Sequence, residues 1–328
     1  MDNPEKSLQA RVRDWLLGEG YPLEFRAARE FRKRGFSVRQ GVYAKSENES
    51  PREVDVIAYG TVPERIRVYH VIECKWSQDK PWVVLTAEGQ QMAESACVNQ
   101  AISSLLGRSL VWILAGDHEV ASLKLFASPV RPGFSGRQAF SKGNDLFYAA
   151  VQSVVSKAKA IVDEYDDHTN LDKRIPEWGA VAFPVIVLRG GLFEGYMDWT
   201  TGDLVVESAK HLRVHWRGSD VWAHHATVDV VSEDYIEEFA HERADDTNVL
   251  LEKMRCARTN VETCWSKSSL ADLHFGPAPR GTTGLPELLH IIHERERAAN
   301  PRRARVGAAN PKAEDEPSRD KGPDQNPN

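Results

Sequence analysis

Two neighbouring segments of the sequence place two carboxylates and one ammonium within otherwise apolar runs. Asp55 lies in the segment 52–59, and Glu73 and Lys75 lie in the segment 71–76. Because successive side chains of a β-strand alternate between its faces, Glu73 and Lys75 share one face. If the two segments pair as a hairpin, Asp55 lies beside Glu73.

The chemistry that this set indicates is hydrolysis of a phosphodiester. Two adjacent carboxylates repel each other unless a cation lies between them, and a hard divalent ion with oxygen ligands meets that need. The sequence therefore predicts a Mg²⁺ site, in which Mn²⁺ can substitute. The ion would polarise a phosphoryl oxygen and lower the pKa of a bound water, while Lys75 would orient that water or stabilise charge in the transition state.

The same residues have a simpler interpretation. Glu-x-Lys is a common triplet, and a charged pair on one face of an edge strand is usually a solvated ion pair. The apolar neighbours Val71, Ile72 and Trp76 favour the functional interpretation, because charges embedded in apolar strands need a partner or a function.

The elements expected around these residues form an α/β core over residues 1–165. Helices are predicted at 11–17 and 22–34, with Gly35 as the stop, followed by a meander of strands at 37–44, 52–59 and 66–76. Further predictions are a helix at 86–106, a buried strand at 109–115 and an amphipathic helix at 144–165.

The second half of the chain is expected to form a C-terminal extension over residues 175–295, rich in β-structure and helix. Residues 180–216 alternate strand-like runs with turn signals, which indicates an antiparallel hairpin or meander. Ser232 is a candidate N-cap of a helix that runs through Phe239. The pattern does not decide whether this extension is a separate unit or packs on the first sheet. Residues 300–328 are too poor in apolar groups to fold and are predicted to be a disordered tail.

Bulk composition sets limits on location and partners. With 328 residues, of which 41% are hydrophobic, the chain can bury a substantial core. A spanning helix needs about 20 apolar residues in a row, and none is found, so a cytoplasmic protein with no membrane contact is expected. The four cysteines are far apart, which argues against a zinc site or a disulfide framework. A net charge of −6 means that any nucleic-acid contact must rest on a local basic surface.

The pattern of Asp55 followed by Glu73-Cys74-Lys75 resembles the PD-(D/E)XK nuclease superfamily, whose signature is an aspartate ending one strand and a Glu-x-Lys triplet on the next. Val54 stands where the signature has proline. The resemblance implies a restriction-endonuclease-like fold, a mixed central sheet flanked by helices. It also implies a metal site to which the Cys74 backbone carbonyl contributes with the two carboxylates.

Members such as Mrr-type restriction endonucleases and archaeal Holliday-junction resolvases carry a helical glutamate upstream of a Gly-Phe or Gly-Tyr pair that opens the first strand. Here Glu24 precedes Gly35 and Phe36 in that arrangement, so the resemblance implies that Glu24 is a further metal ligand. Glu30, on the same predicted helix and nearer Gly35, is the rival for that role.

The predicted helix that carries Glu24 is basic. Arg26, Arg29 and Lys33 lie on it, and Arg39 follows on the next strand. A basic helix beside a metal site could hold a phosphate backbone. The alternative is an amphipathic surface helix whose basic face is only hydrated.

These observations lead to one expected function and two alternatives. We expect a metal-dependent nuclease, foremost a DNA endonuclease of restriction or defence type, with DNA and a second copy of the chain as the expected partners. The first alternative is a catalytically inactive nuclease-fold module that binds nucleic acid or a protein. The second is a metal-free scaffold in which these carboxylates are surface charges. Fold alone does not choose among them.

Overall fold

The computed structural model describes residues 7–44, 52–77, 79–88, 100–142, 146–166, 171, 173–217, 225–271, 273 and 285–299. Its helices are α1 (Leu8–Gly18), α2 (Tyr21–Lys33), α3 (Leu105–Leu114), α4 (His118–Ser122), α5 (Leu146–Asp163), the 3₁₀ turn η3 (Glu233–Tyr235), α6 (Ile236–Lys267) and α7 (Glu287–Ala299). Its strands are β1 (Ser37–Ala44), β2 (Arg52–Val62), β3 (Ile66–Trp76), β4 (Trp82–Thr86), β5 (Ile102–Ser103), β6 (Gly133–Gln138), β7 (Gly179–Arg189), β8 (Leu192–Met197), β9 (Leu204–Ser208), β10 (His211–Arg217) and β11 (His225–Ser232).

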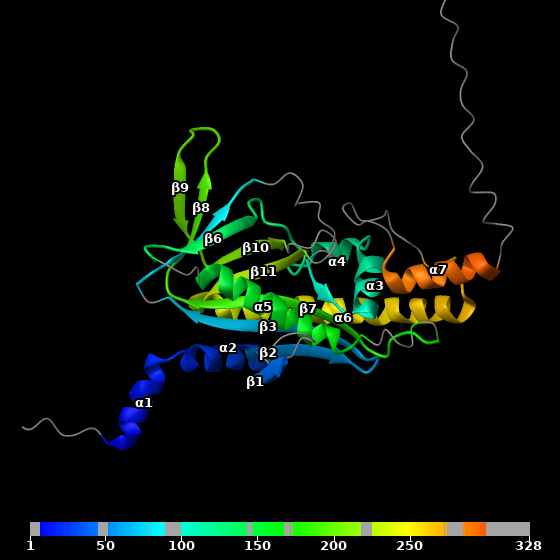
Figure 1. Ribbon diagram of the computed structural model, residues 1–328, viewed down its shortest axis with the longest axis horizontal. Helices are drawn as coiled ribbons and strands as arrows, with labels where there is room; N and C mark the ends of the chain where they lie inside the picture. The colour runs from blue at the N-terminus through cyan, green and yellow to red at the C-terminus, as the bar shows by residue number, and fades with distance from the viewer. Residues whose placement is uncertain are drawn as a thin grey trace, which may run out of the picture.

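All of these strands belong to one mixed sheet of 11 strands in the order β1-β2-β3-β7-β11-β10-β6-β4-β8-β9, with β5 paired to β7. The strands β1, β2 and β3 form an antiparallel meander. Next to it, β7 runs parallel to β3 over its whole length, from Ile66 opposite Gly179 to Trp76 opposite Arg189. The hairpin of β8 and β9 stands away from the body of the sheet (Figure 1).

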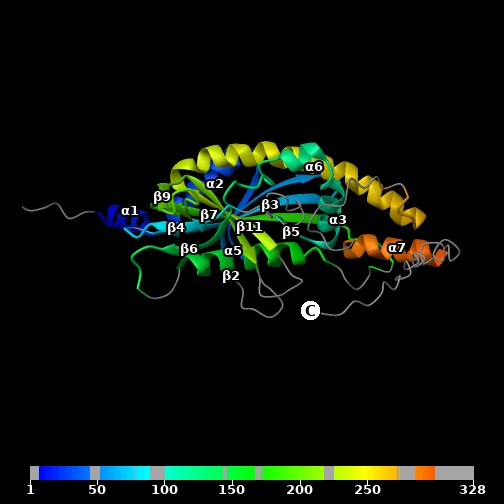
Figure 2. The same ribbon diagram turned by 90° about the horizontal axis from the view of Figure 1, so that it is seen from above.

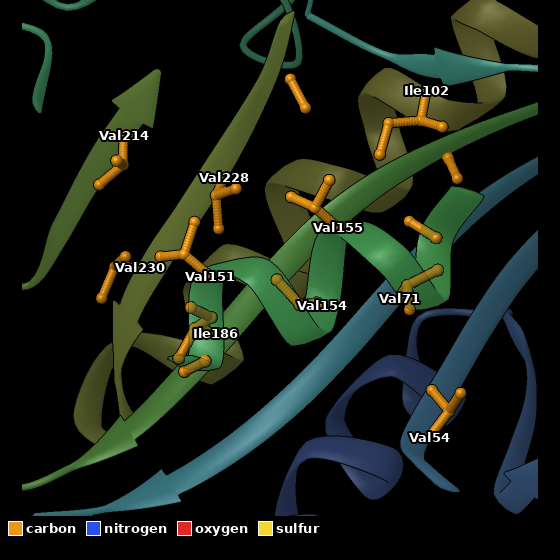
Figure 3. Close-up of a cluster of buried hydrophobic side chains, with 14 of the residues drawn as sticks. Val54, Val71, Ile102, Val151, Val154, Val155, Ile186, Val214, Val228 and Val230 are labelled. Atoms are coloured by element: carbon orange, nitrogen blue, oxygen red, sulfur yellow. The ribbon is translucent and has the colours of Figure 1, made fainter. Parts of the chain in front are cut away.

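Helices cover both faces of the sheet, α5 on one and α6 on the other (Figure 2). Beneath α5 lies an apolar cluster that joins Val151, Val154 and Val155 to strand residues such as Val71 and Ile186 (Figure 3). On the opposite face a second cluster packs α2 and α6 against β2, β3 and β7. The central strands are therefore buried on both faces, which explains their nearly continuous apolar sequences.

The predicted helix and meander at the N-terminus are confirmed. Pro22 lies in the first turn of α2, where its missing N–H costs no hydrogen bond. Gly35 follows that helix with a φ of 88°, a left-handed conformation that glycine adopts without steric cost and that ends the helix. The predicted amphipathic helix at 144–165 is also confirmed, as α5.

Two predicted elements between them are wrong. Residues 86–106 were expected to be helical, but Thr86 ends β4 and Ile102–Ser103 is a strand, while 89–99 lie outside the described residues. Residues 109–115 were expected to form a strand, but they belong to α3, which Ser104 caps by accepting the Gly107 N–H. The helix packs against β7, α6 and α7, so its residues 110–114 are buried or half-buried, and a short apolar run of that kind does not distinguish a strand from a buried helix.

The predictions for the second half are partly correct. The β8–β9 hairpin is antiparallel, as expected. β7, however, pairs in parallel with β3 and β11 instead of with β8, so residues 180–216 are not a single meander. The long helix after Ser232 is present as α6, although Ser232 makes no side-chain capping bond. The predicted disordered tail lies outside the described residues.

Across the described part of the chain, no helix combines the length and apolar character that crossing a membrane requires.

Candidate active site

The meander places Asp55 and Glu73 at neighbouring positions of β2 and β3. Val56 lies opposite Ile72 in the register, so the next step along both strands is Asp55 and Glu73. The Asp55 carboxylate is fixed there, because its Oδ2 accepts a hydrogen bond of 2.7 Å from the Cys74 N–H. The pairing of β2 with β3 ends at Val56 and Ile72, and the Cys74 N–H bond and the effect of the Glu73 charge on Asp55 show that the two carboxylates lie close together just beyond it.

Glu73 is buried and its two oxygens contact two different lysines. Lys75 Nζ lies 2.6 Å from Glu73 Oε1, and Lys157 Nζ, from helix α5, contacts Oε2. The side chains of Glu73 and Lys157 are 5% and 6% exposed, whereas that of Lys75 is 37% exposed. One buried carboxylate is thus held between a buried ammonium and an ammonium that reaches solvent.

The electrostatics of the site are those of carboxylates in close proximity. Burial, and then the Glu73 charge, raise the pKa of Asp55. Burial acts to lower the pKa of Lys75, but the charge and hydrogen bond of Glu73, together with the Asp55 charge, raise that pKa above its usual value. Burial, Asp55, Glu53 and Glu73 together raise the pKa of Glu24 to about 7. The Glu73 charge therefore makes both Asp55 and Glu24 harder to ionise.

Of the two candidate glutamates on α2, Glu24 is the one that interacts electrostatically with Asp55 and Glu73. Within the described residues its side chain makes no hydrogen bond and no ion pair. Glu30 is buried and paired, with its carboxylate 2.6 Å from Arg29 and 3.0 Å from Lys33. Those partners keep the pKa of Glu30 low despite its burial.

The donor chemistry fits a hard divalent ion, although the ligands are not gathered around one point. Within the described ranges, no three His, Cys, Asp or Glu residues lie close enough together to hold a metal ion. Mg²⁺ prefers oxygen donors. The Glu24 carboxylate has no partner among the described residues, and Asp55 uses one of its two oxygens to accept the Cys74 N–H. Glu73 is turned toward its lysines. The metal site, and the Cys74 carbonyl as a ligand, stay predictions.

The four residues expected to bind nucleic acid each have a partner within the protein. Arg26 lies 3.0 Å from Glu233, which also accepts from Arg189. Arg29 and Lys33 share Glu30. Arg39 lies over the ring of Tyr59, 5.5 Å from its centre. Part of the positive charge of α2 is therefore neutralised, while the side chains of Arg29 and Lys33 are still 63% and 52% exposed.

Sequence reasoning missed Lys157 and Arg189. Arg189 ends β7 opposite Trp76 and lies 5.8 Å from the centre of its ring. A signal for Lys157 does exist in the sequence: it falls three positions after Val154 and four before Ile161, on the apolar stripe of α5. A lysine on such a stripe must be paired or functional, since burying an unpaired ammonium is very costly.

Comparison with known proteins gives no relative for this chain: no protein-family model, curated protein or solved structure matches it significantly.

Proposed function

We propose that this protein is a metal-dependent nuclease that hydrolyses phosphodiester bonds, foremost a DNA endonuclease. The observation that carries the proposal is the hydrogen bond from the Cys74 N–H to Asp55, at 2.7 Å, directly beside the Glu73–Lys75 pair. This bond joins the aspartate of one strand to the Glu-x-Lys segment of the next.

The topology around these residues supports the proposal. Helix α2 precedes the meander β1-β2-β3, and α5 leads into β7, which lies parallel to β3 on the side away from β2. A helix, three antiparallel strands, a crossover helix and a parallel strand are what a restriction-endonuclease-like core requires. The residues between β3 and α5, which supply β4, β5, α3, α4 and β6, would then be an insertion into that core.

The proposed roles follow from the chemistry of each group. Glu24, Asp55 and Glu73 would hold Mg²⁺, which supplies Lewis acidity and an activated water when it is bound. Lys75 reaches solvent, and its ammonium can donate three hydrogen bonds to a water or a phosphate oxygen. Arg29 and Lys33 would hold the phosphate backbone through their exposed ends.

A cleavage assay with purified protein tests this proposal. Supercoiled plasmid, linear duplex, single-stranded DNA and RNA are incubated with Mg²⁺, with Mn²⁺ or with a chelator, and Asp55→Asn serves as the matched variant. Asparagine can still accept the Cys74 N–H, so the strand pairing survives while the negative charge is lost. Metal-dependent cleavage by the wild type but not by Asp55→Asn is expected. Equal nicking by both proteins would assign the activity to a contaminant.

One observation favours the alternative of an inactive module that binds nucleic acid or a protein. Both oxygens of Glu73 are held by lysines, and no three-ligand group is present in the described residues. Under this alternative the protein binds DNA without cleaving it, and binding does not depend on metal. A gel-shift measurement with chelator, run beside the cleavage assay, separates the two.

A further inference from the structure

Lys157 interrupts the buried face of α5. Its helical neighbours Val154, Ala158 and Ile161 are all buried in the apolar cluster beneath the helix, and Figure 3 shows Val151, Val154 and Val155 directed toward the strands. A lysine at such a position loses its hydration and most of its rotamer freedom. Its ammonium is directed to one partner among the described residues, Glu73 Oε2.

The charge of Lys157 also acts on the second carboxylate of the site. It opposes the effects of burial and of Glu73 on Asp55. Lys157 thus reaches the site from α5 as a buried side chain, whereas the Lys75 side chain is 37% exposed. Lys159, two positions further along, is exposed and pairs with Asp163 at 2.6 Å, so the placement of Lys157 is specific to that position.

We propose that Lys157 is a built-in counter-cation of the carboxylate pair, which fixes Glu73 and limits the site to a single divalent ion of modest affinity. This inference rests on the proposed function, because it assumes that the carboxylates bind a metal. With every group ionised and no metal bound, the charges of Asp55, Glu73, Lys75 and Lys157 cancel, and Glu24 adds one negative charge. One divalent ion leaves an excess of one positive charge, which suits a phosphodiester anion. A second ion would leave three positive charges before any substrate binds, an arrangement that Coulomb repulsion in a poorly solvated site opposes.

The test is a calorimetric titration with Mn²⁺ in the absence of nucleic acid, on the wild type and on Lys157→Met. Methionine keeps the length of the side chain and removes the charge. The wild type is expected to bind one Mn²⁺ per chain, and Lys157→Met to bind it at least about tenfold more tightly, because an adjacent positive charge no longer repels the ion. A side chain that only supported the site sterically would give the opposite result, since a loosened site binds metal more weakly.

Two control variants test whether the charge of Lys157, and not its size or its helix, sets the Mn²⁺ affinity. Lys157→Arg keeps the positive charge and is expected to bind Mn²⁺ as the wild type does. Lys159→Met removes an exposed ammonium from the same helix and is expected to leave the affinity unchanged. Unchanged or weaker Mn²⁺ binding in a folded Lys157→Met, or two ions bound by the wild type, would overturn the inference.

A stability measurement covers the cases in which the single variant unfolds or the wild type binds no metal. The midpoint of urea unfolding is compared for the wild type, Lys157→Met, Glu73→Gln and the double variant. The double variant contains neither the buried ammonium nor the buried carboxylate. Lys157→Met is expected to lower the midpoint strongly in the wild type and hardly at all beside Glu73→Gln. Absence of this coupling would contradict the counter-cation role directly. Coupling without metal binding or cleavage would reject both the nuclease proposal and the metal-limiting role, and leave a structural ion pair.

Discussion

The two glutamates of helix α2 lie in opposite environments, and substitution by glutamine should reveal this as opposite effects on stability. Glu24 has no partner in the described residues, and its pKa is raised from 4.5 to about 7 by burial and by neighbouring carboxylates. Glu30 has a lowered pKa, because Lys33 and Arg29 offset the effect of its burial. Glu24→Gln should stabilise the fold at pH 8, and Glu30→Gln should destabilise it.

The sign follows from proton linkage. Between pH 4.5 and pH 7 folded Glu24 holds a proton that the unfolded chain has lost, so folding becomes less favourable as the pH rises, and above pH 7 the full cost is present. A tenfold change in a proton-binding constant corresponds to about 1.4 kcal/mol. Because Glu24 retains some contact with water, we discount the total to roughly 1 to 2 kcal/mol at pH 8. At pH 4 both the folded and the unfolded chain are protonated at this position, and Glu24→Gln should have little effect.

For Glu30 the linkage is reversed. Its lowered pKa contributes stability that is present above the unfolded value of 4.5 and is lost as the pH falls through the folded value. Glu30→Gln is therefore expected to cost about 1 to 2 kcal/mol at pH 7 and above, less than the full contribution of hydrogen bonds to a charged group because Arg29 and Lys33 are more than half exposed. The same helix thus supplies a matched control in which the pH dependence has the opposite direction.

Urea unfolding followed by circular dichroism at pH 4, 6 and 8 measures both effects, with and without Mn²⁺. Added Mn²⁺ should raise the stability of the wild type at pH 8 through mass action, and should do so much less in Glu24→Gln, which lacks a proposed ligand. A stability gain in Glu24→Gln that is equal at pH 4 and pH 8 would refute the electrostatic reasoning. A loss of stability at pH 8 would show that Glu24 has a partner in the folded protein.

Three further predictions concern catalysis, the buried charge network and the tail. Lys75→Ala should abolish cleavage and leave Mn²⁺ binding largely intact, whereas Asp55→Ala should lose both, because a carboxylate is a metal ligand and an ammonium is not. Calorimetry measures the Mn²⁺ binding and a cleavage assay measures the activity, and full cleavage by Lys75→Ala would refute the prediction. Asp229 is buried, 2.8 Å from Arg213 and 3.6 Å from Arg243. Asp229→Ala should lower the free energy of unfolding, measured in urea, by about 3 to 5 kcal/mol, because it leaves two guanidinium groups with too few partners. A loss under about 1 kcal/mol would show that water replaces the carboxylate. Deletion of residues 301–328 should leave the melting temperature in place, since the segment has little apolar surface to bury; a large drop would mean that it docks on the fold.

The sequence was sufficient to predict the arrangement of the α2 helix and the meander, because local signals determine it. Runs rich in β-branched and aromatic residues indicated the strands, Gly35 marked the end of α2, and the short hairpin between β2 and β3 brings Asp55 beside the Glu73–Lys75 segment. Each of these depends on residues close together in the chain, where periodicity is informative.

The remaining parts depend on contacts between residues far apart, and there the sequence signal failed. The apolar run of α3 is as typical of a buried strand as of a buried helix. Its packing against β7, α6 and α7 is what favours the helix. Lys157 contacts Glu73 across 84 positions of the chain. Lysines are mostly surface residues, whereas the position of Lys157 on the apolar stripe of α5 buries it.

The place of β7 in the sheet has a consequence for how the protein is synthesised. β3 lies between β2 and β7, and Ile66 finds its parallel neighbour only at Gly179. At about 5 to 20 residues per second, the ribosome needs several seconds to deliver that strand. During this interval one edge of β3, the strand that carries Glu73 and Lys75, has unpaired backbone groups and is open to wrong strand pairing. A chain that terminates before Gly179 is therefore expected to be a substrate for chaperones and proteases, and not a small active fragment. The proposed nuclease would thus complete the sheet around its active site only after more than half of the 328 residues are translated.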